Sequence, residues 1–180
     1  MVQFWDSIPN HLAEWALTQP IFFTASAPLT GSHINISPKG LPASTFTIFS
    51  PNTAAYIDAT GSGSETVSHV YENGRVTVMF CSFDANPRIL RLFCWGEVVE
   101  WDDEPAFGAM VARMGKKEKV VVGARAVVRL RVWKVSFFWG GWNDFCPSHP
   151  RPQFYTEYCF IFVWFQMGGA SRRSYCFLHT

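Results

Sequence analysis

The stretch Thr60-Gly61-Ser62-Gly63-Ser64-Glu65-Thr66 follows a predicted strand and opens a predicted helix. Its glycines let the backbone bend sharply and approach a ligand closely. Free N–H groups at a helix N-terminus, together with Ser and Thr hydroxyls, suit a phosphate group. The stretch is not a Walker loop, which needs Gly-Lys-Ser/Thr, and it lacks the third glycine of the dinucleotide fingerprint. A capped turn, with Ser62 or Ser64 capping the helix, is the alternative interpretation.

A second polar segment, His33-Ile34-Asn35-Ile36-Ser37-Pro38-Lys39-Gly40, alternates polar and apolar residues with the period of a strand. The pattern predicts a strand over residues 33–37 with its polar side chains on one face. Lys39 is able to neutralise a phosphate, and Asn35 and Ser37 are able to hydrogen-bond one. An ordinary strand edge facing solvent is the alternative.

The rest of the chain predicts short strands joined by tight turns. Strands are expected over residues 21–24, 46–49, 54–58, 75–83, 88–99 and 124–135, and helices over 9–18, 64–72 and 105–114. Hairpin turns such as Asp84-Ala85-Asn86-Pro87 favour antiparallel pairing. We therefore expect a mainly β fold, closer to a barrel with flanking helices than to a doubly wound sheet.

Composition limits the class of protein. A chain of 180 residues has room for one domain with a real core. The net charge of +1 gives no reason to expect a nucleic acid or an anionic membrane as partner. No apolar run approaches the roughly 20 residues of a membrane span. Five cysteines without C-x-x-C spacing support neither a disulfide framework nor a metal site. We expect a soluble, cytoplasmic protein.

Other chemically active side chains give weaker signals. His69 is expected on an exposed helix face, and Cys81 and Cys94 in the core. No Ser-His-Asp or Cys-His set can be assembled, so no catalytic residue is named. Strand arginines either approach an anionic cofactor or lie on a solvated sheet face: these are Arg75, Arg88 and Arg91, while Arg125, Arg129 and Arg131 are expected to be exposed.

The composition changes from Ser136 onward. Residues 136–180 hold 14 of the 30 aromatic side chains and three of the five cysteines. Such an apolar surface would be an aggregation liability. Two interpretations stay open: a final strand with a docking segment that buries these rings, or sequence foreign to the native family, such as a translated intron. We therefore expect one domain over residues 5–135 and an atypical segment over 136–180.

Four segments, in order and with suitable spacing, resemble one known family. They read HINISPKG at 33–40, YIDATGSGSET at 56–66, ENGRVTVMF at 72–80 and PRILRLF at 87–93. Together they are similar to the pyridoxamine-5′-phosphate-oxidase-like proteins, and especially to an uncharacterised fungal and bacterial branch. The resemblance covers roughly residues 5–135.

This resemblance implies a six-stranded antiparallel split β-barrel of Greek-key type that forms a homodimer with FMN at the dimer interface. In such proteins a strand and the turn that opens the following helix hold the flavin phosphate. Those positions are residues 33–39 and 60–66 here. The implied cofactor-binding residues are Asn35, Ser37, Lys39, Ser62, Ser64 and Thr66.

Three departures from the family pattern stand out. Glu65 takes a place where the family's vitamin-processing members tend to have a basic residue, which argues against pyridoxamine phosphate as substrate. Cys94 stands near a place where glycine is expected. Phe137-Phe138-Trp139 follows Ser136, where a Ser-Cys-Gly-Tyr-Gly-Val-Pro-like segment is expected.

The resemblance implies an FMN-dependent oxidoreductase that acts on a small molecule not identified by the sequence. In that reading the flavin performs the redox chemistry and the protein binds and orients it. Two alternatives stay open, since fold does not fix function. One is a non-catalytic module that binds flavin, deazaflavin or haem. The other is an inactive, truncated product.

Overall fold

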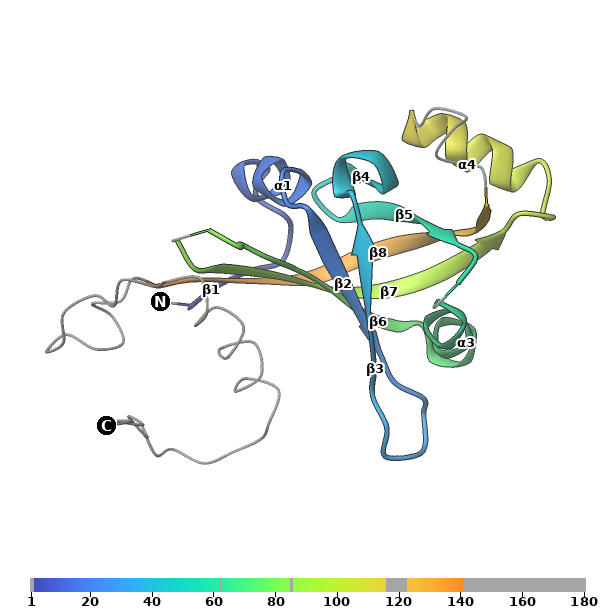
Figure 1. Ribbon diagram of the computed structural model, residues 1–180, viewed down its shortest axis with the longest axis horizontal. Helices are drawn as coiled ribbons and strands as arrows, with labels where there is room; N and C mark the ends of the chain where they lie inside the picture. The colour runs from blue at the N-terminus through green and yellow to red at the C-terminus, as the bar shows by residue number, and fades with distance from the viewer. Residues whose placement is uncertain (1, 62, 85, 116–122, 141–180) are drawn as a thin grey trace, which may run out of the picture.

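The computed structural model describes residues 2–61, 63–84, 86–115 and 123–140. Twelve elements follow one another along these ranges (Figure 1). They are β1 Val2–Trp5, α1 Asn10–Leu17, β2 Ile21–Ser26, β3 Asn35–Gly40, α2 Pro42–Thr45, β4 Phe46–Ser50, β5 Thr53–Ala59, α3 Ser64–Asn73, β6 Arg75–Cys81, β7 Arg88–Glu100, α4 Ala106–Met114 and β8 Ala124–Trp139.

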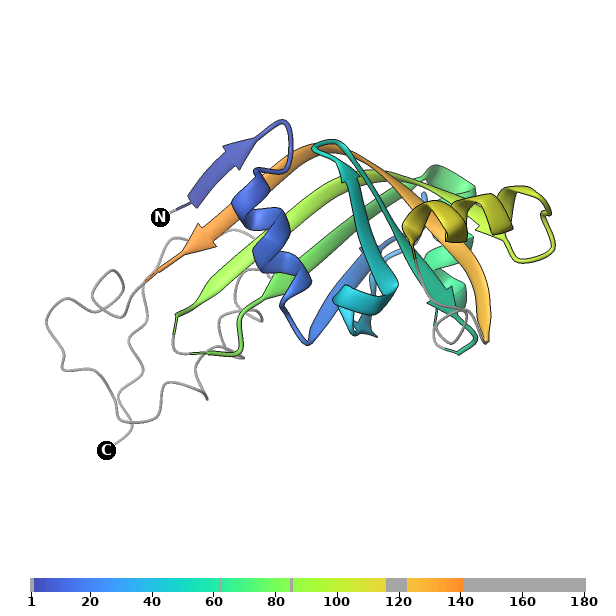
Figure 2. The same cartoon turned by 90° about the horizontal axis from the view of Figure 1, so that it is seen from above.

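All strands belong to one antiparallel sheet in the order β3-β2-β6-β7-β8-β5-β4. The long strand β8 is shared along one edge by two partners. Its first half pairs with β5, and its last residues pair with β1 through Trp5↔Val135 to Val2↔Phe138. Its other edge pairs with β7 along nearly its whole length. The two long strands curve together across the molecule (Figure 2).

The expected antiparallel β class is confirmed, but the count of six strands that the family resemblance implies is wrong. Eight strands are present in the described residues. The sequence interpretation missed β1 and the short helix α2. β1 covers only four residues, and most of its side chains are exposed. A strand of this kind has too little apolar alternation for a periodicity argument to detect it.

The last strand is longer than predicted, because β8 continues past Val135 to Trp139. Phe137 and Phe138 are 9% and 7% exposed and belong to different apolar clusters. A strand buried on both faces reads as a continuous apolar run, without alternation. Residues 141–180, which make up most of the predicted atypical segment, lie outside the described residues.

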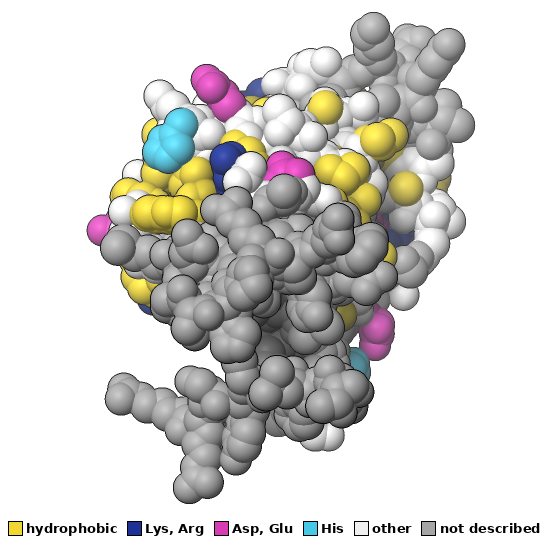
Figure 3. All heavy atoms as spheres, turned by 60° about the vertical axis from the view of Figure 1, so that its left-hand side comes forward, with side chains coloured by type: hydrophobic (Ala, Val, Ile, Leu, Met, Phe, Trp, Pro, Cys, Tyr) yellow, Lys and Arg dark blue, Asp and Glu magenta, His cyan; other side chains and the backbone are white. Residues whose placement is uncertain are grey.

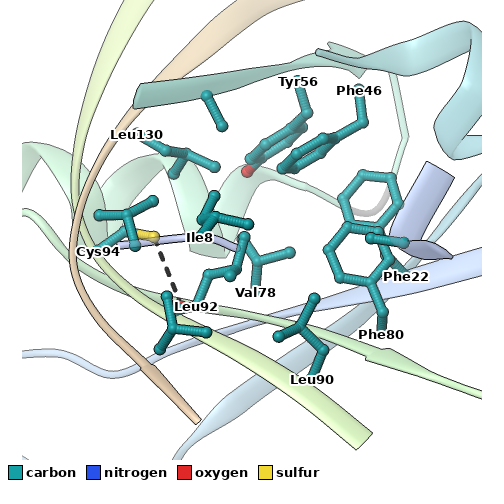
Figure 4. Packing of buried hydrophobic residues seen from close by; sticks show 14 of the residues in the cluster. Ile8, Phe22, Phe46, Tyr56, Val78, Phe80, Leu90, Leu92, Cys94 and Leu130 are labelled. Carbon is teal, nitrogen blue, oxygen red and sulfur yellow. Dashed lines mark hydrogen bonds between the residues drawn. The ribbon is translucent and has the colours of Figure 1, made fainter. Parts of the chain in front are cut away.

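The main core lies between the curved sheet and helix α1. Aromatic rings fill one end of it, where Phe22 packs edge-on against Phe46 and Tyr56 and stacks on Phe80 (Figure 4). Aliphatic side chains such as Leu92 and Leu130 fill the other end. The hydroxyl of the fully buried Tyr56 points into this cluster (Figure 4). Burial raises the pKa of Tyr56 far above its usual value, so the phenol stays neutral.

Helices α3 and α4 cover other parts of the sheet (Figures 1 and 2). Phe107 and Met114 of α4 form a second apolar cluster with β5, β7 and β8. Val70 of α3 joins the main core, and Gly96 of β7 lets that helix pack closely, because a Cβ there would lie 3.2 Å from Val70. α3 therefore has a fixed position beside the sheet.

The surface carries mixed side chains. On the face drawn in Figure 3, the described acidic, basic and histidine side chains are scattered among apolar and other groups, without a large patch of one charge. In the ranges that the structure describes, no helix has the length and apolar character needed to cross a membrane.

Candidate functional site

The polar face of β3 points into the protein, toward helix α3. Asn35 and Ser37 are 9% and 6% exposed, whereas Ile34 and Ile36 on the other face are 74% and 42% exposed. The alternative of a strand edge facing solvent is therefore wrong for these polar residues. β3 also continues through Pro38, which the sheet tolerates because β3 is an edge strand.

Asn35 joins β3 to the first turn of α3. Its Nδ2 donates to Thr66 Oγ1 at 2.9 Å and to Ser26 Oγ at 3.3 Å. Ser37 Oγ donates to Asn35 Oδ1 at 3.3 Å. Thr66 is fully buried. Three of the residues predicted to bind the cofactor therefore form one connected hydrogen-bond network, although they are separated by up to 31 positions in the chain.

His69 closes the buried end of this network. Its Nδ1 lies 2.9 Å from Ser26 Oγ, and the residue is only 7% exposed. The expectation that His69 is exposed is wrong, because α3 turns this side chain toward β2. Ser26 Oγ also accepts a hydrogen bond from Asn35, and the direction of the Ser26–His69 hydrogen bond depends on the tautomer of the imidazole.

A charged cluster lies further along the same face of β3. Lys39 Nζ donates to Asp58 Oδ1 at 2.5 Å, and Arg125 donates to Asp58 Oδ2 from Nε at 3.1 Å and from Nη2. The Asp58 side chain is completely buried, while those of Lys39 and Arg125 are 13% and 24% exposed. A buried carboxylate needs such partners, because an unpaired one loses its hydration without compensation.

The turn before α3 fits tightly over this cluster. A Cβ on Gly63 would lie 2.5 Å from Asp58 Oδ1 and 2.7 Å from Arg125 Nη2, too close for any side chain. The same turn is fixed to the start of β8, because Thr60 donates its backbone N–H to the carbonyl of Gly123 at 2.8 Å. The glycine is needed here for close approach.

The first turn of α3 has no side-chain cap, because Gly63 occupies the cap position. The alternative of Ser64 capping the helix is wrong, and Ser62 lies outside the described residues. The first N–H groups of an α-helix have no partner within the helix. Ser64 is exposed beside them. Glu65, also exposed, pairs with His33 at 3.0 Å.

The structure thus brings together part of the predicted site. Asn35 is hydrogen-bonded to both Ser37 and Thr66, and Lys39 lies further along the same strand face. Sequence reasoning missed Asp58 and assigned Arg125 to the surface. A signal for Asp58 exists, since it is the one charged residue in the apolar strand β5. The sequence holds no such signal for Arg125, because the pairing of β8 with β5 determines where its side chain points.

The other arginines lie elsewhere or face solvent. Arg75 donates to Asn73 and to the carbonyl of Pro28, at the C-terminal end of α3. Arg91 is half-buried on β7, where burial lowers the pKa of its guanidinium. Arg129 pairs with Glu97 across an exposed face at 3.4 Å. Cys81 and Cys94 are buried in the core, as predicted. Within the described ranges, no three His, Cys, Asp or Glu side chains are grouped to hold a metal ion.

Comparisons with known proteins agree with this architecture. The family model described as pyridoxamine 5′-phosphate oxidase matches residues 8–139. The pyridoxamine 5′-phosphate oxidase family protein ustO of Aspergillus flavus is 57% identical over 137 residues. That match covers 76% of this chain and 54% of ustO, so the chain spans about half the length of this relative.

Solved structures share the fold at low sequence identity. A protein from Lactobacillus delbrueckii superposes with a TM-score of 0.54 at 18% identity, covering 73% of this chain and 94% of its own. An FMN-binding protein from Syntrophomonas wolfei superposes with a TM-score of 0.51 at 11% identity, covering 69% and 84%. The split-barrel fold is therefore shared with proteins of this group, and the family match reaches the end of β8. The chain belongs to the pyridoxamine 5′-phosphate oxidase family.

Proposed function

We propose that this protein binds FMN, with the flavin phosphate held between β3 and the first turn of α3. The observation that carries the proposal is the direct contact of these two segments, since Asn35 Nδ2 donates to Thr66 Oγ1. The family resemblance had assigned both segments to the flavin phosphate from sequence alone, without information about a contact between them. Membership of the pyridoxamine 5′-phosphate oxidase family, together with a fold shared with an FMN-binding protein, supports the same ligand.

The chemistry of the site suits a phosphate. Lys39 supplies a positive charge, and the helix N-terminus supplies partial positive charge and free N–H groups. Ser64 is exposed at that terminus. Asn35, Ser37 and Thr66 donate to or accept from one another, so we infer that they hold β3 and α3 at the correct separation as well as lining the site.

We further propose that the protein is an oxidoreductase acting on a small molecule. A bound flavin supplies the electron transfer, and the protein orients it and excludes water. The exposed His33–Glu65 pair beside the site places a carboxylate where the family's vitamin-processing members tend to have a basic group. We therefore expect a substrate other than pyridoxamine phosphate. A cytoplasmic location stays a prediction from the sequence.

A homodimer is the third part of the proposal. Large apolar side chains are exposed on the outer face of the sheet: Ile34, Ile36, Trp95 and Trp133. Ile34, Trp95 and Trp133 also line a hollow of about 350 Å³. Exposed apolar surface of this kind marks interaction sites. We propose a second copy of the chain as its partner.

The absorption spectrum of the purified protein tests the proposal. Flavin bands that bleach on addition of a reductant and return on oxidation support a redox protein. A protein that binds FMN but whose flavin is not reduced by any reductant would favour the non-catalytic module. A colourless protein that ignores added FMN would overturn the proposal.

Matched variants then test the position of the phosphate. Lys39→Ala and Ser64→Ala should weaken FMN binding more than riboflavin binding, because only FMN carries the phosphate. A charge-assisted contact contributes about 1.5–3 kcal/mol, so the Lys39 effect should reach roughly tenfold or more. Equal weakening of both ligands would argue against a phosphate at this site.

A further inference from the structure

The cluster Lys39–Asp58–Arg125 carries two cations on one buried carboxylate. It therefore has a formal excess of one positive charge in a partly buried position. An ammonium group has three N–H donors and a guanidinium has five. In the described part of the chain, Asp58 takes one donor of Lys39 and two of Arg125. The remaining donors and the excess charge suit an anionic ligand.

Arg125 reaches this cluster through an irregularity in the sheet. Asp58 pairs with Ala126, but the next residue of β5, Ala59, pairs with Ala124. Arg125 is thus the extra residue of a β-bulge on β8. A bulge redirects a side chain, and bulges are frequent beside functional sites. Without it, the alternation of β8 would place Arg125 on the same face as the exposed Arg129 and Arg131.

The cluster also lies against the turn that opens α3. Nη2 of Arg125 occupies the space that a Cβ of Gly63 would need, and Thr60 is bonded to Gly123, two residues before Arg125. The start of β8 and the N-terminus of α3 are therefore held together. Three elements, β3, β8 and the start of α3, therefore converge on one place, where Lys39 and Arg125 lie beside the N-terminus of the helix.

We propose that Arg125 is a second cationic residue that binds the flavin phosphate, beside Lys39, and that Asp58 is a positioning residue that holds Lys39 and Arg125 at a fixed separation. The guanidinium is suited to this role because its planar donors match phosphate oxygens. The Asp58 carboxylate cannot donate a hydrogen bond to a phosphate oxygen, but it orders two long side chains before the ligand arrives. This inference rests on the proposed FMN binding.

Titration of the 180-residue protein with FMN and with riboflavin tests the inference. Arg125→Met should weaken FMN binding about tenfold or more and leave riboflavin binding within about twofold. Arg125→Lys keeps the charge and should recover part of the FMN affinity. Arg129→Met is the matched control, since it removes an exposed arginine of the same strand, and both affinities should stay at the wild-type values.

Asp58→Asn keeps the shape of the side chain and removes its charge. If Asp58 positions the cations, this change should lower the FMN affinity while riboflavin binding is retained. A purely structural role would weaken both ligands together, and that result would overturn the role of Asp58. Thermal unfolding of each variant identifies loss of fold.

The titrations distinguish a wrong role for Arg125 from a failure of the proposed FMN binding. If the wild-type protein binds FMN but Arg125→Met and Arg125→Lys both bind it normally, or lose both ligands equally, the role of Arg125 is wrong and the proposed function stands. If the wild-type protein binds neither ligand, both fail.

Discussion

Gly63 shows how a single residue determines the geometry of the site. Its φ of −126° is one that other residues adopt readily, so its need for glycine comes from space and not from backbone strain. The Asp58 carboxylate and the Arg125 guanidinium fill the position of a side chain. Glycine is therefore needed at position 63 because the turn before α3 packs closely on the Asp58–Arg125 ion pair.

Gly63→Ala should destabilise the protein, because the ion cluster must move to admit a methyl group. Overpacking of this kind typically costs about 1–3 kcal/mol. Gly40→Ala is a suitable control, since a Cβ there meets nothing within 4 Å. Urea unfolding measures both. Equal stability of the two variants would show that the turn has more room than described.

Cys94 should make the stability depend on pH under alkaline conditions. Burial raises the pKa of its thiol above the usual value, while the unfolded chain loses this proton near pH 8.5. Above that pH the unfolded state binds fewer protons than the folded state, so the free energy of unfolding falls as pH rises. The full contribution is present below about pH 8.5.

Urea unfolding at pH 7.5 and 9.5 checks this effect. The difference between the two pH values should be smaller in Cys94→Val than in the wild type, by up to about 1.4 kcal/mol per pH unit. Tyr56→Phe should leave the difference unchanged, because an unfolded tyrosine titrates only near pH 10. An unchanged difference in Cys94→Val would contradict the expectation.

At the scale of single residues, the sequence predicts some residues of the site and misses others. Asn35, Ser37 and Thr66 were found because alternation and family motifs mark them, and the structure brings them into contact. Arg125 was assigned to the surface because alternation along β8 was assumed to be unbroken. A bulge depends on pairing with β5, which local sequence does not encode.

At the scale of elements, β3 and β8 show where pattern reasoning succeeds and where it fails. Period-two alternation placed the side chains of β3 correctly in two groups but could not say which group is buried. The polar group is inside because α3 and Asp58 supply hydrogen-bond partners for it. The apolar residues at the end of β8 lack alternation because both faces of the strand are buried.

Phe137→Ala tests whether the end of β8 belongs to the folded domain. Phe137 is 9% exposed and packs edge-on against Trp15, with ring centroids 5.9 Å apart. Truncation of a buried phenylalanine typically costs about 3–5 kcal/mol. Trp101→Ala removes an aromatic ring that is 61% exposed and should change stability by no more than about 0.5 kcal/mol. A small effect at Phe137 would place the domain boundary near residue 135 after all.

At the scale of the whole molecule, the antiparallel class could be predicted because short strands and hairpin turns are local signals. The number of strands could not, since β1 is recognised only by its pairing with the end of β8. The oligomeric state could not be predicted from local sequence either, because it depends on which side chains the folded surface exposes. The exposed Ile36 and Trp133 suggest one sheet face as the contact between two copies.

Ile36→Lys should shift the protein from dimer to monomer, because it places an ammonium group on the proposed contact. Sedimentation or light scattering measures the mass in solution. Trp101→Lys changes an exposed aromatic residue outside that face and should leave the mass at the wild-type value. A wild-type monomer, or an Ile36→Lys dimer, would contradict the proposed contact.

Above all, we propose that β3 and the α3 turn hold the phosphate of a flavin. Titration of the unmodified 180-residue protein with FMN and with riboflavin, followed by flavin fluorescence, tests it most directly. We predict that FMN binds at least about tenfold more tightly than riboflavin, because charge-assisted hydrogen bonds form only with the phosphate. Equal affinities for the two ligands, or binding of neither, would contradict the account.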